Sequence, residues 1–165
     1  IMDYTRKIVK VNGFEDQIVL LHGKMEEVKL PVDKVDIIIS EWMGYFLLYE
    51  SMLDSVLWAR DKYLKKDGLV FPDRAAMKIC AIEDGDYRKE KIDFWDNVYG
   101  FDMKCIKQTA LLEPLVDTVE SDAVITNSSV LYDIDIRSVK VEDLAFKKNF
   151  KIVFNKNDTL SLIHI

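Results

Sequence analysis

Several residue types that mark common classes of protein are scarce in this sequence. Its 165 residues include only two cysteines, Cys80 and Cys105, and two histidines, His22 and His164. These residues stand far apart, so their spacing argues against a zinc site and predicts free thiols in a reducing compartment. No apolar run approaches the ~20 residues that a membrane-spanning helix needs. We therefore expect no metal ion and no membrane contact.

A glycine-rich GxGxxG turn is also absent. Because this turn cradles phosphates in dinucleotide-binding folds, either the chain binds no nucleotide or the turn precedes Ile1. Basic residues are outnumbered, with 23 Lys and Arg against 29 Asp and Glu and a net charge of −6. An acidic surface repels phosphates, so direct nucleic-acid binding is disfavoured and a basic peptide partner is favoured.

The first 71 residues alternate between helical and extended patterns. Asp3 is a candidate cap for the first helix and Gly13 a candidate end, while Gly68 is expected to end the second helix. The expected elements are a helix at 3–13, a strand at 18–21, a strand at 35–40 covered on both faces, a helix at 51–64 and a strand at 69–71. This alternation predicts an α/β sheet with parallel strands.

The pattern changes after Pro72, which is a candidate cis residue between two domains. Four segments alternate like antiparallel strands: 75–83, 130–136, 150–154 and 159–165. Between the first two lies an aromatic stretch with helical spacing, residues 86–114, in which one face is expected to hold Ile92, Trp95, Val98 and Tyr99. We expect domains at 1–71 and 72–165 and, from the unusual first and last residues, truncation at both ends.

The most informative segment is the loop at residues 40–53, SEWMGYFLLYESML. Glu41 follows a predicted parallel strand, at the edge where open α/β sheets bind ligands. Glu50 comes nine residues later, and Gly44 permits a turn that brings the two carboxylates together. The loop also holds four aromatic residues: Trp42, Tyr45, Phe46 and Tyr49.

Two carboxylates among aromatic residues suit several kinds of chemistry. They can bind a metal, although two acids without further ligands make a poor site. They can act as a general acid and base on a sugar. They can also clamp a guanidinium, whose planar fork matches carboxylate oxygens. The plainest alternative is that both acids are solvated loop charges and the aromatic residues fill a core.

The loop resembles the double-glutamate loop of type I protein arginine methyltransferases. Shorter segments resemble the same family in the same order: KIVKVNG, GKMEEVKLPVDKVDIII, FPDRA, AIED, NVYGFDM, EPLVD and VKVEDL. The resemblance implies an α/β plus β fold. Residues 1–71 would be the C-terminal half of a Rossmann-like S-adenosylmethionine-dependent methyltransferase domain. Residues 72–165 would be part of a β-barrel domain, with an inserted helical dimerisation arm at about 86–114.

The resemblance also implies roles for the loop. Glu41 and Glu50 would hold the guanidinium of a substrate arginine while its free nitrogen attacks the methyl carbon of S-adenosyl-L-methionine. Tyr45 would line the arginine pocket. Met52 corresponds to a residue that narrows the site and is linked to asymmetric dimethylation, although its spacing fits an ordinary core methionine equally well.

Three further residues would contact the cofactor. Glu26 corresponds to the acid that accepts a hydrogen bond from the adenine amino group, Met25 would lie beside the ring, and Ser55 near the methionine portion. Without the resemblance, Glu26 would be a solvated loop charge. The family's glycine-rich turn and ribose-binding acid precede the region covered here. We therefore expect the isolated chain to bind S-adenosylmethionine weakly or not at all.

The leading hypothesis is an enzyme that forms mono- and asymmetric dimethylarginine in Arg/Gly-rich proteins, with histones among the candidate substrates. It would form a homodimer, bind no nucleic acid directly, and reside in the cytoplasm and nucleus. A second hypothesis is an inactive module that associates through the arm. A third, a sugar-processing enzyme, has only the carboxylate pair in its favour.

Overall fold

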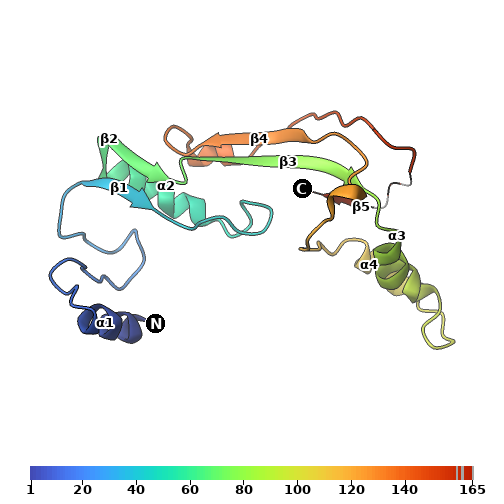
Figure 1. Cartoon of the computed structure of the whole chain (residues 1–165), viewed down its shortest axis with the longest axis horizontal. Coiled ribbons are helices and arrows are strands. Elements are labelled where there is room, and N and C mark those ends of the chain that lie inside the picture. Colours follow the sequence, from blue (N-terminus) through green and yellow to red (C-terminus); the bar gives the residue numbers. More distant parts are fainter. Residues whose placement is uncertain (159, 161, 165) are drawn as a thin grey trace.

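A computed structural model of the chain describes residues 1–158, 160 and 162–164. The molecule is elongated, with α1 at one end, two sheets along its length and short helices at the other end (Figure 1). The helices and strands are α1 (Met2–Val11), β1 (Val35–Ile39), α2 (Met52–Tyr63), β2 (Leu64–Phe71), β3 (Arg74–Ile82), α3 (Gly85–Tyr87), α4 (Lys104–Ala110), β4 (Ser129–Asp135) and β5 (Leu162–His164). Four short helical turns accompany them: η1 (Arg88–Ile92), η2 (Asp93–Asp96), η3 (Ser121–Ala123) and η4 (Val141–Leu144).

Helix α1 lies where the sequence predicts it, but Asp3 does not cap it. Asp3 lies inside the first turn, where its carboxylate accepts a hydrogen bond from Arg6 at 3.1 Å. Gly13 follows the helix with φ +72°, the left-handed conformation expected of a residue that closes a helix. None of the described helices has the length and hydropathy that crossing a membrane requires.

The first sheet is parallel, as predicted, with α2 connecting β1 to β2. Gly68 does not end α2; it lies inside β2, which begins directly after the helix. A Cβ atom at Gly68 would lie 2.9 Å from the backbone oxygen of Asp36. The register between the strands also shifts between Val35 and Ile37. Glycine is therefore needed where the two backbones approach closely, not where the helix stops.

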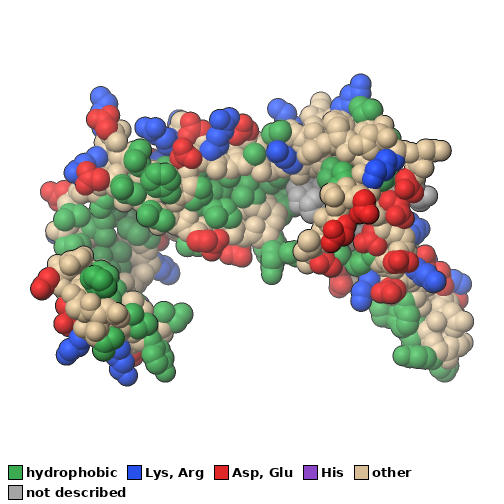
Figure 2. All heavy atoms as spheres, viewed as in Figure 1, with side chains coloured by type: hydrophobic (Ala, Val, Ile, Leu, Met, Phe, Trp, Pro, Cys, Tyr) green, Lys and Arg blue, Asp and Glu red, His purple; other side chains and the backbone are tan. Residues whose placement is uncertain are grey.

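Two further expectations for the first 71 residues are wrong. Residues 18–21 form no strand, because they pair with no other segment among the described residues. They are also mostly exposed. Strand β1 is present but is not covered on both faces, since Ile37 is 51% and Ile39 80% exposed. Hydrophobic side chains accordingly gather on the surface over β1 and β2 (Figure 2).

The second sheet is antiparallel, with β3 between β4 and β5. It begins just after a cis peptide bond between Phe71 and Pro72, as expected. Strands β3 and β4 confirm the predicted segments 75–83 and 130–136. Residues 150–154 form only a single bridge, Phe154 to Thr126, and no strand. The last predicted strand is present at β5, while residues 159, 161 and 165 lie outside the described residues.

A helical segment at residues 85–112 leaves the end of β3 and folds back on itself (Figure 1). Ile92 and Val98, two of the four residues expected on one face, are buried within it. Tyr99 does not share their face and is 92% exposed. The helix ends at η2, and Val98 and Phe101 then form a tight bridge around Tyr99 and Gly100, both with positive φ. A turn replaces the helical periodicity that the prediction assumed.

One hydrophobic core joins both halves of the chain. The first half of the chain supplies Trp42, Leu53, Val56, Leu57 and Val70, and the second half supplies Ile134, Ile136 and Val139. Because these side chains pack in one cluster, the loop before α2 is held against the segment that follows β4.

Candidate active site

The loop of residues 41–50 begins at the carboxyl end of β1, as the sequence predicts. The backbone N–H of Ser40 donates to the carbonyl of Phe71 at 3.0 Å, which fixes the last residue before Glu41 against β2. Trp42, which follows Glu41, is 2% exposed and lies in the shared core. A buried anchor therefore follows Glu41 directly, while Glu41 itself is exposed.

Gly44 is the point at which the loop folds back. Its backbone N–H donates to the carbonyl of Leu47 at 3.3 Å, and the N–H of Tyr49 donates to the carbonyl of Tyr45 at 3.1 Å. The Glu50 side chain lies directly over Gly44, since a Cβ atom there would be 2.7 Å from the Glu50 Cδ. A larger residue at position 44 would require the flexible Glu50 side chain to shift from this place.

Three non-glycine residues in this loop have left-handed backbone conformations: Phe46 (φ 53°), Leu47 (φ 60°) and Ser51 (φ 55°). Each such conformation costs about 1–3 kcal/mol, and such residues gather at binding and catalytic sites. The loop retains them because Trp42 near its start and Leu53 after it are buried in one core. The strained backbone and the two exposed acids thus lie in the same short segment of the chain.

The carboxylates of Glu41 and Glu50 are exposed, and neither makes a hydrogen bond or an ion pair with any described residue. Tyr45 and Met52 are also exposed beside them, at 61% and 46%. No third acid, Cys or His among the described residues completes a metal-binding group. Two unpaired acids flanked by exposed aromatic residues suit an organic cation that donates hydrogen bonds.

The segment at residues 24–28 is held against α2 by side-chain hydrogen bonds. The Ser55 hydroxyl donates to Oε1 of Glu26, and the Tyr63 hydroxyl donates to the carbonyl of Val28 at 3.2 Å. The hydrogen bond from Ser55 holds the pKa of Glu26 below its usual value of 4.5. The structure therefore brings together Glu26 and Ser55, two of the three predicted cofactor residues, while Met25 is half-buried beside Glu26.

Helix α2 carries or orients nearly every candidate residue. Glu50 immediately precedes its N-cap residue, Ser51, and Ser55 lies in its second turn. It also carries Arg60, which sequence reasoning missed and which is buried. The available signal was its position: Arg60 continues the helical spacing of Leu53 and Leu57, so a charge falls on the apolar stripe.

Two hollows elsewhere on the surface do not include the loop. One is lined by acidic residues at the base of the helical segment, among them Glu83, Asp84 and Glu120. Figure 2 shows the acidic side chains that gather in this part of the molecule. The other lies between β4 and η4.

Comparison with known proteins places this geometry in a family. Residues 73–164 match the family model described as the arginine methyltransferase oligomerization subdomain, which covers more than half of the 165 residues. The chain belongs to the arginine methyltransferase family. The subdomain and the structural neighbours fit the C-terminal part of a methyltransferase.

Curated relatives include protein arginine N-methyltransferase 1 of Schizosaccharomyces pombe, which is 62% identical over 152 residues. The Dictyostelium discoideum protein of the same name is 55% identical over 159 residues. These alignments cover 92% and 96% of this chain but only 45% and 46% of the relatives. The chain thus spans less than half the length of these relatives.

Solved structures agree with the sequence matches. A chain of the Trypanosoma brucei PRMT1 enzyme–prozyme heterotetrameric complex with AdoHcy superposes with a TM-score of 0.85 at 52% identity, over 90% of this chain and 47% of that one. Arabidopsis thaliana protein arginine methyltransferase 10 gives a TM-score of 0.67 at 29% identity, over 86% of this chain and 46% of that one.

Proposed function

We propose that this chain provides the arginine-binding part of an enzyme that transfers methyl groups from S-adenosylmethionine to protein arginines. The observation that carries the proposal is the pair of exposed, unpaired carboxylates, Glu41 and Glu50, on a strained and well-anchored loop at the carboxyl end of β1. The family membership and the neighbour solved with AdoHcy support the same reaction.

Catalysis on this loop is mainly positioning and electrostatics. Glu41 and Glu50 accept hydrogen bonds from two guanidinium nitrogens and hold positive charge there, which leaves electron density on the third nitrogen. S-adenosylmethionine, when bound, would supply an electrophilic methyl carbon, and its sulfur would take the electron pair of the bond that is lost. The loop holds the third nitrogen in line for that displacement, and the methylated nitrogen releases one proton to water.

The residues near α2 fit part of the methyl donor. Glu26 uses Oε1 to accept from Ser55, and its exposed carboxylate can also accept a hydrogen bond from an amino group such as that of adenine. Met25 beside it offers a soft apolar contact for a ring. Ser55 both orients Glu26 and lies in the second turn of the helix that Glu50 precedes.

In the proposed site, Tyr45 and Met52 form the walls of the arginine pocket next to Glu41 and Glu50. Both are exposed in this chain, so each is available to a bound arginine. Met52 occupies the first position of α2, directly after Ser51. In this role Met52 limits the room around the attacking nitrogen and favours asymmetric dimethylation after the first methyl transfer.

The negative charge of the chain indicates which substrates it attracts. A net charge of −6 and unpaired loop acids attract basic peptides, so Arg/Gly-rich proteins and histone tails are the proposed substrates. The same acidic surface disfavours direct nucleic-acid contact.

A second function, association, is favoured by the helical segment. Tyr99, Phe101 and Leu112 are exposed there at 92%, 69% and 84%. Exposed aromatic and aliphatic residues are enriched at protein interfaces. The segment lies within the matched oligomerization subdomain. We propose that it acts as the arm of a homodimer and that β3, β4 and β5 belong to a β-barrel.

The proposal is tested by methyl transfer to a Gly/Arg-rich peptide, read by mass spectrometry. The assay uses the 165-residue chain and a chimera in which this chain replaces the matching segment of the Schizosaccharomyces pombe relative, here called the yeast chimera. We expect the chimera to methylate the peptide and Glu50→Gln to lower the rate at least ~100-fold. An active yeast chimera that tolerates Glu50→Gln would refute the arginine-binding role of the loop.

A further inference from the structure

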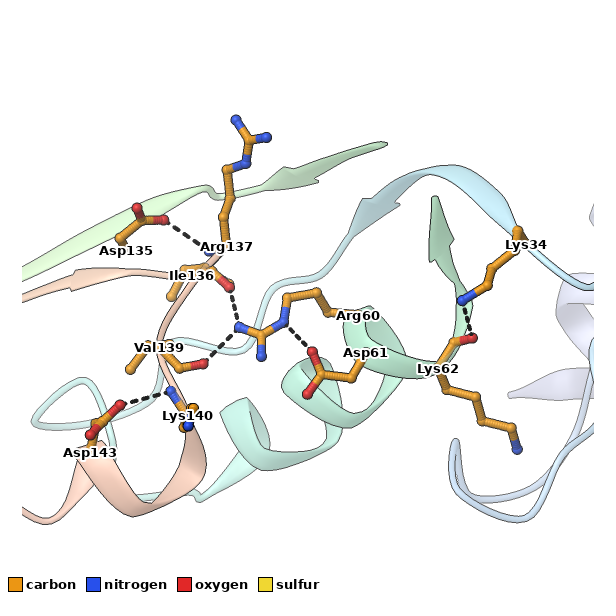
Figure 3. A network of polar contacts seen from close by, with 10 residues as sticks. All are labelled: Lys34, Arg60, Asp61, Lys62, Asp135, Ile136, Arg137, Val139, Lys140 and Asp143. Atoms are coloured by element: carbon orange, nitrogen blue, oxygen red, sulfur yellow. Dashed lines mark hydrogen bonds and ion pairs between the residues drawn. The ribbon is translucent and has the colours of Figure 1, made fainter. Parts of the chain in front are cut away.

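Arg60 is a buried charged residue that has no role in the proposed methyl transfer. It lies on α2 and is 9% exposed. Its Nη1 donates to the carbonyls of Ile136 and Val139, each at 2.7 Å, and its Nε donates to Asp61 at 2.8 Å (Figure 3). A buried guanidinium is costly unless it is well hydrogen-bonded, so these contacts hold α2 firmly to the segment after β4.

The two carbonyls that accept from Arg60 are themselves fixed. The backbone N–H of Val139 donates to the carbonyl of Asp135 at 2.9 Å, and that of Ile136 to the carbonyl of Asp73 at 2.8 Å. The Ile136 and Val139 side chains lie in the shared core with Leu57. Arg60 therefore bonds to a rigid turn rather than to a mobile loop.

Helix α2 transmits this constraint to the loop. From Met52 to Arg60 the helix rises about 12 Å, at about 1.5 Å per residue. Glu50 lies just before Met52, and the N-cap residue Ser51 makes no side-chain hydrogen bond that would fix the helix start. The start of α2 is held by Leu53 in the shared core, so a tilt of α2 at Arg60 that shifts Leu53 in that core also moves the Glu50 carboxylate over Gly44.

We propose that Arg60 is a positioning residue for Glu50: by joining α2 to the turn at residues 136–139, it sets the place of the loop carboxylate relative to the second half of the chain. Its catalytic consequence rests on the proposed arginine-binding role of Glu50. Its structural consequence, a loop ordered by a contact at the other end of α2, is independent of that role.

Three variants separate positioning from folding. Arg60→Lys keeps the charge but loses the planar fork that reaches three acceptors. Asp61→Asn is milder, since Asp61 is exposed and serves only the Nε contact. Arg74→Lys is the matched control: Arg74 also donates two hydrogen bonds, at 2.8 and 2.6 Å to Asp133, but it joins β3 to β4 and is exposed.

The first readout is kcat in the yeast chimera, normalised to the folded fraction measured by circular dichroism. We expect Arg60→Lys to lower kcat by about 10- to 100-fold, because small misplacements of a catalytic group are costly, while KM for the peptide changes little. Asp61→Asn should show a smaller loss of the same kind, and Arg74→Lys none.

The second readout is amide hydrogen exchange on the 165-residue chain. Arg60→Lys should speed exchange at residues 44–51 and 136–140 more than elsewhere, and Arg74→Lys should not. A uniform rise in exchange with an unchanged normalised kcat would overturn the proposal, since Arg60 would then hold only the fold. If Glu50→Gln abolishes methyl transfer while Arg60→Lys and Asp61→Asn do not lower it, the positioning role fails and the proposed function stands. If Glu50→Gln is harmless, the proposed function fails, and local exchange alone decides whether Arg60 orders the loop.

Discussion

The loop at residues 41–50 and the helical segment at residues 85–112 have similar aromatic side chains but leave different groups without partners. Each has a buried anchor, Trp42 in the loop and Ile92 in the helical segment. In the loop, Glu41 and Glu50 pair with no residue that the structure describes. In the helical segment several charges pair with one another: Lys107 with Asp93 at 2.7 Å and with Asp96 at 2.9 Å, and Lys104 with Asp102 at 3.3 Å.

This difference indicates what each region binds. Unpaired acids on a strained loop attract a cation and leave room for its hydrogen bonds. The ion pairs of the helical segment offset several of its charges, and its exposed Tyr99 and Leu112 are apolar groups available for contact. On the proposed function, the same aromatic richness serves ligand binding in the loop and association in the helical segment.

The distinction between the two regions is tested most strongly by shortening one acid in each and measuring the rate of methyl transfer. Glu50→Asp keeps the charge but withdraws the carboxylate by one methylene from its place over Gly44. We expect roughly 100-fold slower methyl transfer in the yeast chimera, because the guanidinium is no longer held in line. Glu113→Asp makes the same change beside the helical segment, and its rate should match that of the parent. Equal losses in the two variants would contradict the distinction.

Stability should separate the buried and exposed apolar residues of the two regions. Leu57→Ala opens a cavity beside Trp42 in the shared core, where Leu57 is 1% exposed. It should lower the free energy of unfolding by about 2–5 kcal/mol in urea denaturation. Leu112→Ala removes an exposed side chain and should change that energy by less than about 0.5 kcal/mol. A large loss for Leu112→Ala would show that the helical segment packs on its own chain.

Association should depend on the helical segment alone. The double variant Tyr99→Ser, Leu112→Ser removes two exposed apolar groups, and we expect the yeast chimera carrying it to sediment as a monomer where the parent forms a dimer. Tyr45→Ser and Phe46→Ser in the loop remove comparable exposed groups and should leave the dimer intact. Dissociation caused by the loop variants instead would place the interface at the active site.

The smallest expected effect concerns pH. The hydrogen bond from Lys107 holds the pKa of Asp93 below 3.8, so this pair stabilises the folded segment above pH 3.8 and loses that contribution as the pH falls through the lowered pKa. Lys107→Met should therefore speed amide exchange of the helical segment at pH 7 and leave unfolding at pH 2 close to that of the parent. A Lys107→Met effect that persists at pH 2 would mean that packing, not the ion pair, is lost.

Elements with strong local periodicity could be predicted from the sequence. Helix α2 and the pair β3–β4 lie within a few residues of their predicted positions, because one apolar stripe or strict alternation specifies each. The place of Glu41 after β1 followed from the same logic. The contact between Glu50 and Gly44 confirms that the loop folds back at that glycine.

The failures share a dependence on distant partners. Residues 18–21 have strand-like side chains, but a strand also needs a neighbour to pair with. Gly68 looked like a helix end, whereas close approach to Asp36 requires it. Tyr99 follows the helical spacing of Ile92, yet a turn exposes it. The role of Arg60 depends on carbonyls 76 and 79 residues away, which no local pattern reveals.

The central claim, that Glu41 and Glu50 hold one guanidinium together, is tested most directly by a double-mutant cycle in the yeast chimera. Methyl transfer is measured for the parent, Glu41→Gln, Glu50→Gln and the double variant. If the two acids act as a unit, each single variant loses most of the activity and the double variant loses far less than the product of the single losses. Fully multiplicative losses, or a harmless substitution at either position, would contradict a shared guanidinium.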